Sequence, residues 1–276
     1  MKMRTRKIKD KIFTIVSILA VIFITLPLAH IIYTVVINGA QAINLEFLTK
    51  LPKPPGEIGG GIINAIEGTA VLVGLTLLIS FPPGLLTGIY LSEYGKGKHV
   101  NIIRDIINTL SGLPSIVAGL LAYTIIVIKY GFSAISGAFA LSLLAIPYIV
   151  RTSEEAIKMV PNEIREAGLA LGLPKWKVTL YLVLGAARPR IIAGVLLATA
   201  RIIGEAAPLL FTAFGSPHHV TSLFEPVSAL PLIIFIYAIS PYKDWHTKAW
   251  GAALVLMIIV LTINFAVKYY MKRTRI

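Results

Sequence analysis

Long apolar runs alternate with short polar segments along almost the whole chain. After a basic start, apolar runs cover residues 12–37 and about 62–91, 106–128, 132–150, 191–214 and 249–267. A helix needs about 20 residues to cross the roughly 30 Å of hydrocarbon in a bilayer, so each run predicts one span. We therefore expect an all-α, polytopic membrane protein with six transmembrane helices.

Three segments add detail to this pattern. Residues 227–239 are apolar but too few to span, so they form either a re-entrant segment or a helix at the membrane surface. The second run is interrupted by Pro82, Pro83 and Gly84, which predict a kink or a hinge. The first run is longer than the core of a signal peptide and lacks a small-residue cleavage site, so we expect it to be a retained span.

Composition agrees with a membrane protein and removes several kinds of chemistry. Of the 276 residues, 56% are hydrophobic and 14% are charged, whereas soluble domains carry about 25% charged residues. The absence of cysteine excludes disulfides, thiolate metal sites and thiol catalysis. The sequence has no phosphate-binding loop and no metalloprotease or serine-hydrolase motif. We expect no cofactor and no metal, and any uphill transport would draw its energy from a partner subunit or an ion gradient.

Positive charge is distributed unevenly between the loops. Of the 26 Lys and Arg residues, 20 lie in the N-terminal tail, the loop after the second run, the segment 151–190 and the C-terminus, while five lie in the alternate loops. Cytoplasmic loops are enriched in Lys and Arg, so both termini are expected in the cytoplasm. The net charge of +13 then reflects topology within membrane lipid, not nucleic-acid binding. Residues 1–11 would form a cytoplasmic basic tail, and residues 12–276 a single transmembrane domain of a multi-pass protein of the cell membrane.

The segment 151–190 carries signals typical of short helices. Pro161 is well placed to start a helix, Gly172 to stop it, and Pro174 to open the next one. The apolar residues of this first helix, 161–171, recur at three- and four-residue spacing and share one face: Ile164, Ala167, Gly168 and Leu171. Such an elbow can dock into a groove on another protein or pack on its own spans, and the pattern does not separate the two.

Two charged residues interrupt the fifth run. Arg201 lies near its middle, and Glu205 follows four residues later, on the same face of a continuous helix. Charges at mid-membrane depth cost about 2.5–3.5 kcal/mol each on insertion scales and usually mark a solute path. The forked guanidinium of Arg201 suits a tetrahedral oxyanion, and Glu205 would orient it or accept a proton from hydrogen phosphate. The alternative is a structural ion pair that only locks helix packing.

A polar break also interrupts the third run at residues 111–115, which read Ser-Gly-Leu-Pro-Ser. Pro114 suits the first turn of a new helix with Ser111 or Gly112 as its cap, and such a half-helix presents free N–H groups to an anion. A simple kink is the alternative. The predicted substrate path therefore consists of Arg201, Glu205, Ser111 and Ser115.

The segment 151–190 resembles the EAA loop of bacterial and archaeal ABC-importer permeases, whose pattern is E-A-A-x₃-G-x₉-I-x-L-P. Glu166, Ala167 and Gly172 match this pattern, while Gly168 replaces the second Ala and Gly185 replaces the Pro. The resemblance implies a permease of the type I ABC-importer kind, whose elbow fits a cleft in an ATP-binding subunit. The coupling residues that it implies are Glu166, Ala167, Gly168, Leu171, Gly172 and Pro174.

Other segments resemble phosphate-importer permeases of the PstA type. Residues 200–211 are similar to their R-x-x-G-E and A-P-L-L-F segment, residues 113–117 to their P-S-I-V segment, and residues 230–235 to the region before their last span. The resemblance implies the transmembrane permease subunit of an ATP-driven phosphate importer. It also implies the partners: a second, PstC-like permease, two ATP-binding subunits, an extracytoplasmic phosphate-binding protein and inorganic phosphate.

Other functions remain open at this point. A permease of the same kind could carry sulfate, molybdate or phosphonate. A membrane-embedded enzyme acting on lipid phosphate could use Glu205 as acid or base, although no nucleophile is evident beside Arg201. A sensor or scaffold would transport nothing. On the permease interpretation the chain is not an enzyme, and ATP is hydrolysed on a partner chain.

Overall fold

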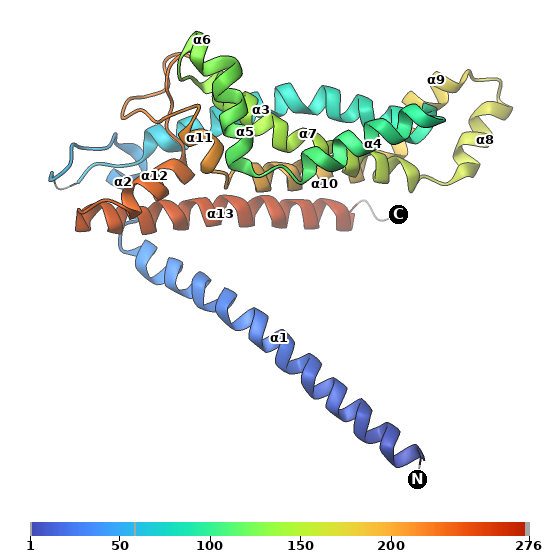
Figure 1. Ribbon diagram of the computed structural model, residues 1–276, viewed down its shortest axis with the longest axis horizontal. Helices are drawn as coiled ribbons and strands as arrows, with labels where there is room; N and C mark the ends of the chain where they lie inside the picture. Colours follow the sequence, from blue (N-terminus) through green and yellow to red (C-terminus); the bar gives the residue numbers. More distant parts are fainter. Residues whose placement is uncertain (1, 58, 274–276) are drawn as a thin grey trace.

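The computed structural model describes residues 2–57 and 59–273, and its regular structure is helical (Figure 1). This described part contains no strand, only two isolated bridges, Pro52 with Gly60 and Phe214 with Val227, so the all-α class is confirmed. The α-helices are α1 (Lys2–Ala40), α2 (Leu45–Thr49), α3 (Ile63–Ile89), α4 (Lys98–Ser111), α5 (Ser115–Ala122), α6 (Ile128–Tyr130), α7 (Ala134–Lys158), α8 (Asn162–Ala170), α9 (Lys175–Lys177), α10 (Leu184–Ile202), α11 (Ala207–Leu210), α12 (Leu230–Ala238) and α13 (Lys243–Arg273). They are joined in places by the π-helical turns η1 (Tyr90–Tyr94), η2 (Tyr123–Val127) and η3 (Val178–Val183).

The predicted spans correspond to elements of the structure. Within the described residues, five helices are long and apolar enough to cross a membrane: Lys9–Ala40, Ile63–Tyr94, Ala134–Lys158, Lys175–Ile202 and Lys243–Arg273. A sixth span results if Lys98–Ser111 and Ser115–Tyr130 are taken together, although the two halves are bent by 102°. The bend lies within residues 111–115, where the polar break predicted an interruption.

The predicted limits of two spans are wrong, both next to the segment 151–190. Helix α7 continues to Lys158 instead of ending at residue 150, and the fifth span begins at Lys175 and ends at Ile202. Charged side chains on one face lower the average hydropathy of these turns, so an average over both faces makes the fourth span end too early and the fifth begin too late. The fifth was also extended too far, because the apolar residues after Ile202 form a turn and the short helix α11 instead of continuing α10. The other face is apolar and packs into one buried cluster that includes Ala156, Ile157, Val178, Val183 and Ala187.

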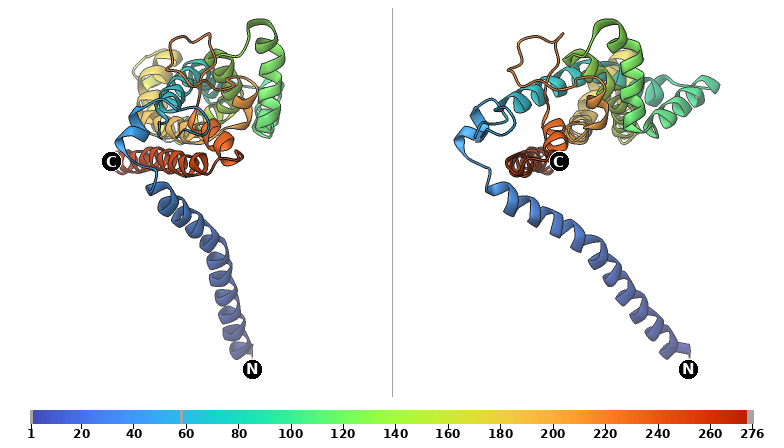
Figure 2. Two further views of the ribbon diagram at one scale, coloured as in Figure 1. Left: turned by 90° about the vertical axis from the view of Figure 1, so that its left-hand side faces the viewer. Right: turned by 60° about the vertical axis from the view of Figure 1, so that its left-hand side comes forward.

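Helices α3 and α7 pack side by side in the bundle, and α10 contacts both α7 and α13 (Figure 2). Small residues allow the close approach. A Cβ atom at Gly84 of α3 would lie 2.7 Å from Ile149 of α7, and one at Gly88 would lie 2.7 Å from Ser153. Small residues at helix interfaces are the usual means of packing spans tightly in a membrane.

The short apolar segment 227–239 forms α12, which packs against α13 and α3. Leu230, Leu232 and Ile233 are buried, and the Leu230 N–H donates to the hydroxyl of Thr69 at 2.9 Å. The segment therefore contains a short helix at one end of the bundle that the protein covers on one side, while Phe235 and Ile239 stay exposed. We call this end of the bundle the α12 end, and the opposite end, which carries α8, the α8 end.

Most of helix α1 projects away from the bundle, and its C-terminal end joins it (Figure 1). Every residue from 9 to 33 is exposed, and the contact with the bundle is made near Gly39, which lies against Trp250 and Leu254 of α13. Helix α1 begins, and α13 ends, toward the α8 end of the long axis (Figure 1).

Candidate functional site

The helix predicted at residues 161–171 is present as α8, with Pro161 as its N-cap and Leu171 as its C-cap. Gly172 follows with φ +75°, a left-handed conformation that glycine adopts without strain and that ends many helices. Pro174 then caps the next helical turn, as predicted. We call residues 159–174 the elbow.

The structure divides the predicted apolar face of α8 between two directions. Gly168 is buried, and a Cβ atom there would lie 2.7 Å from Leu182 and 2.9 Å from Val178. Ile164 packs on the same buried cluster. This contact explains why glycine replaces the second alanine of the loop pattern. Ala167 points the other way and is exposed.

Apolar side chains are exposed on the elbow and on the helical turn that follows it. Leu171 is 80% exposed, Met159 61% and Trp176 54%. Exposed apolar side chains can face lipid or a partner protein, so these residues form a candidate docking surface. The remaining exposed coupling candidates are Glu166, Gly172 and Pro174.

Arg165 fastens α8 to the bundle. Its Nε and Nη2 donate to Oε1 of Glu93 in η1 at 3.0 and 2.7 Å. Its Nη1 donates to the carbonyl of Val160 at 2.6 Å, and Nη2 donates to that of Ile157 at 2.9 Å. The side chain of Glu93 is only 6% exposed, so it needs this partner. One guanidinium therefore joins α8 both to the second span and to the end of α7.

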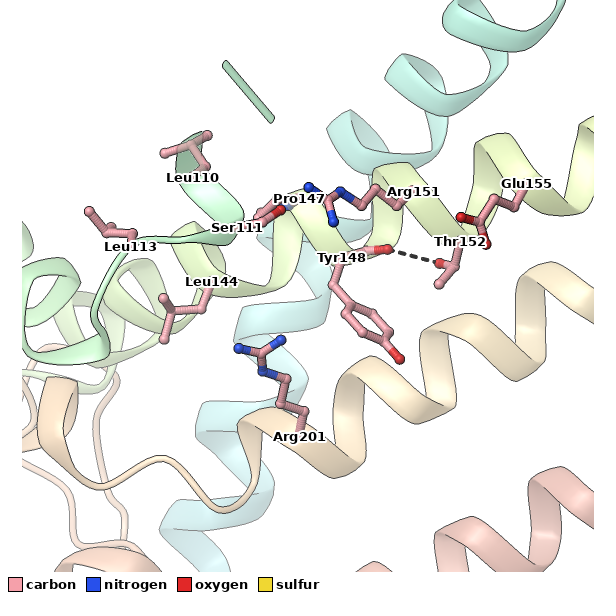
Figure 3. Close-up of a pocket in the computed structure, with 10 residues that line it drawn as sticks. All are labelled: Leu110, Ser111, Leu113, Leu144, Pro147, Tyr148, Arg151, Thr152, Glu155 and Arg201. Atoms are coloured by element: carbon pink, nitrogen blue, oxygen red, sulfur yellow. Dashed lines mark hydrogen bonds between the residues drawn. The ribbon is translucent and has the colours of Figure 1, made fainter. Parts of the chain in front are cut away.

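A cavity of about 330 Å³ lies where the last turn of α10 faces α7 and the end of α4 (Figure 3). The guanidinium of Arg201 points from α10 toward α7, which contributes polar side chains to the cavity (Figure 3). The lining residues with polar groups are Ser111, Tyr148, Arg151, Thr152, Glu155 and Arg201.

Arg201 and Glu205 are not paired, which corrects the expectation that they share a helix face. Helix α10 ends at Ile202, and Glu205 follows in a turn before α11, so the four-residue spacing no longer aligns them. Among the described residues, the side chain of neither forms an ion pair or hydrogen bond. Glu205 also lies outside the residues that line the cavity.

The serines of the polar break differ from expectation as well. Ser111 does not cap the second half of the third span, because it is the last residue of α4 and its hydroxyl donates to the carbonyl of Ile107 at 2.8 Å. Pro114 is the N-cap of α5. Ser111 lines the cavity together with Arg201, whereas Ser115 does not.

Sequence reasoning missed two charged residues of this cavity, Arg151 and Glu155. They follow the fourth apolar run and were assigned to a cytoplasmic loop, but α7 continues through both. Their four-residue spacing could have placed them on one face of a helix, but not beside Arg201.

A second cavity, of about 680 Å³, lies at the α12 end between residues 51–55 and 214–218, beside Tyr237 and Trp245. Near it, His219 Nδ1 lies 3.0 Å from the carboxylate of Glu67. Within the described residues there is no cluster of three or more His, Asp or Glu side chains that could hold a metal ion. This larger cavity is mainly apolar, so the charged one beside Arg201 is the better candidate for an anion.

A bundle of spans around a charged cavity, with an elbow at one end, is the architecture of a multi-pass membrane permease. The family model described as "Binding-protein-dependent transport system inner membrane component" matches residues 84–276. This is well over half of the chain, and the chain belongs to this family.

Relatives along nearly the whole length are named phosphate transport system permease protein PstA. The one from Xylella fastidiosa is 41% identical over 246 residues, covering 88% of this chain and 85% of that protein. The one from Yersinia pestis is 39% identical over 265 residues, with 95% and 90% covered. The one from Haemophilus influenzae is 39% identical over 272 residues, with 98% and 96% covered.

Solved structures show the same fold at lower identity. An inward-facing form of the MetNI methionine ABC transporter aligns with a TM-score of 0.59 and 21% identity, over 78% of this chain and 95% of that one. An amino acid ABC transporter with histidines aligns with a TM-score of 0.55 and 19% identity, over 76% and 94%. The fold is that of a type I ABC-importer permease. The chain is a multi-pass protein of the cell membrane that works with a second permease and ATP-binding subunits, and it is not an enzyme.

Proposed function

We propose that this chain is the transmembrane permease subunit of an ATP-driven phosphate importer, and that Arg201 binds the anion on its way through. The observation that carries the proposal is the guanidinium of Arg201, which has no ion-pair or hydrogen-bond partner among the described residues and lies in a cavity between α4, α7 and α10. The names of the relatives, phosphate transport system permease proteins, support phosphate as the anion.

The chemistry of the cavity favours this role. A guanidinium inside a membrane protein is costly unless it is paired, and a tetrahedral oxyanion supplies the two parallel hydrogen bonds that its fork is shaped for. Ser111 and Tyr148 add hydroxyl groups to the same cavity. Ser115 and Glu205 lie outside it and stay candidates for other positions on the path.

Helix α7 runs from the anion cavity to the elbow, so it can couple transport to ATP hydrolysis on a partner subunit. With the α8 end and both termini in the cytoplasm, the apolar outer surface of the elbow docks on an ATP-binding subunit. Helix α7 ends at Lys158, directly before the elbow, and carries cavity residues from Leu144 to Glu155, the last of them one turn before that end. A displacement of the elbow therefore moves one wall of the anion cavity. A phosphate-binding protein would deliver its anion at the opposite, α12 end, and a PstC-like permease would supply the other half of the path.

The test is uptake of radiolabelled phosphate by proteoliposomes that contain the complete importer. Arg201→Gln should lower uptake at least about tenfold, since a hydrogen bond to a charged group contributes roughly 1.5–3 kcal/mol. Assembly and basal ATPase activity should persist. Arg190→Gln is the matched control, because Arg190 is exposed on the same helix and lies outside the cavity. Normal uptake by the Arg201 variant would defeat the proposal.

Competition identifies the anion in the same assay. Excess arsenate, which shares the shape and protonation of phosphate, should inhibit uptake, and excess sulfate should not. Inhibition by sulfate without inhibition by arsenate would instead favour a permease for another oxyanion.

A further inference from the structure

The cavity beside Arg201 holds more charge than that residue alone. Arg151 lines it from α7, and one of its nitrogens, Nη2, donates to Oδ1 of Asn108 in α4 at 2.8 Å. This bond anchors the side chain, and its other N–H groups have no partner among the residues that the structure describes. Glu155 lines the same cavity one turn further along α7 (Figure 3). The cavity therefore contains two guanidinium groups and one carboxylate.

Consecutive glutamates of α7 are in opposite situations. Glu154 is buried and accepts hydrogen bonds from Arg104 at 2.7 Å and Lys158 at 2.6 Å. Glu155 is exposed to the cavity, and in the part of the chain that the structure describes its carboxylate has no ion pair and no hydrogen bond. Its carboxylate is thus an acceptor that the fold itself does not use.

We propose that Arg151 and Glu155 complete the anion site of Arg201, and that Glu155 makes the site specific for oxyanions that carry a proton. This inference rests on the proposed function of the cavity. The sequence suggested Glu205 as the acceptor for the proton of hydrogen phosphate. Glu155 takes this role here, because it lines the same cavity as Arg201, whereas Glu205 lies outside that cavity.

The physical reason lies in what a carboxylate can do. An ionised carboxylate only accepts hydrogen bonds. Hydrogen phosphate has a P–OH group that donates to it, and the proton stays on the phosphate. Sulfate has no proton at neutral pH, so its oxygens meet the oxygens of Glu155 without a hydrogen between them and are repelled. A carboxylate beside two guanidiniums therefore weakens the binding of sulfate while it strengthens that of hydrogen phosphate, which is how a site discriminates between anions of one shape.

The experiment measures equilibrium binding of radiolabelled phosphate and of radiolabelled sulfate to the solubilised complex of both permeases and the ATP-binding subunits. The extracytoplasmic binding protein is left out, because it would impose its own selectivity. Glu155→Gln keeps the size of the side chain and removes its charge. We expect phosphate affinity to fall, sulfate affinity to rise, and the preference for phosphate to drop at least about tenfold. Glu57→Gln, in an exposed loop outside the cavity, should keep the preference of the unaltered complex.

The outcomes separate this inference from the function on which it rests. An unchanged preference in Glu155→Gln, with binding lost in Arg201→Gln, overturns the role of Glu155 and leaves the anion site standing. Loss of preference in Glu205→Gln instead also overturns it. Both proposals are overturned if the unaltered complex binds no phosphate. They are also overturned if neither Glu155→Gln nor Arg201→Gln changes phosphate binding. If Glu155→Gln does not assemble, Glu155→Asp keeps the charge: retained rejection of sulfate supports the inference, and loss of that rejection overturns it.

Discussion

Arg165 in the elbow and Arg201 in the cavity carry the same functional group in opposite conditions. Arg165 donates to Glu93 and to the carbonyls of Ile157 and Val160, so its donors are spent on holding helices together. Arg201 has no such partner among the described residues. A guanidinium whose donors are all bonded to the protein holds helices together. One whose donors are free and face a cavity is available to a ligand. The same contrast separates Glu154 from Glu155, and three changes test it further.

The largest effect on stability is expected from Arg165→Ala. The change leaves the carboxylate of Glu93, which is 6% exposed, without its partner. Removing one member of a buried pair costs about 3–5 kcal/mol, and partial exposure of Arg165 reduces this to about 2–3 kcal/mol. Thermal unfolding of the assembled complex should shift down, and phosphate uptake should fall with it. Arg165→Lys, which keeps the charge but not the fork, should lose less; an unchanged melting temperature in Arg165→Ala would show that the ion pair is not a fastener.

Ala167→Asp should leave stability within about 0.5 kcal/mol, because the residue is exposed. It should still lower phosphate uptake at least about tenfold, since a charge on an apolar docking surface is left without a partner when that surface is covered. ATPase activity would continue without transport. The control is Asn162→Asp, which adds the same charge at the start of α8, away from Leu171. Normal coupling in Ala167→Asp would mean that the elbow is not the coupling element.

The smallest effect on phosphate transport and anion binding is expected from Glu154→Gln. Its partners Arg104 and Lys158 are 39% and 51% exposed, so water replaces most of what they lose, and the cost is about 1 kcal/mol. The ratio of phosphate to sulfate binding should stay that of the unaltered complex. A changed ratio would remove the distinction between a structural and a ligand-binding glutamate on which the comparison depends.

Local signals predicted the elbow well. Pro161, Gly172 and Pro174 each act on the backbone within a few residues, so their consequences could be derived without the rest of the fold. The existence of each span followed from length and apolarity in the same way. The direction in which each residue of α8 points could not be derived, because it depends on Val178 and Leu182, which approach Gly168 from another helix.

The charged cavity was only partly predictable. The pairing of Arg201 with Glu205 assumed one continuous helix, although Gly204 and Pro208 already signalled that it ends. Arg151 and Glu155 belong to the cavity only because α7 extends past its apolar run and lies against α10. That proximity joins residues about 50 positions apart, and no spacing rule within one helix contains it.

Helix α1 has a consequence for how the protein enters the bilayer. It is the most apolar of the candidate spans, and none of its central stretch is covered by the rest of the chain, so its place in lipid depends on its own side chains alone. Helix α7 is the reverse: it carries Arg151, Glu154 and Glu155 and is largely enclosed by its neighbours. The first helix can therefore be stable in the membrane by itself, whereas α7 is stable there only together with the helices that surround it, above all α3 and α10.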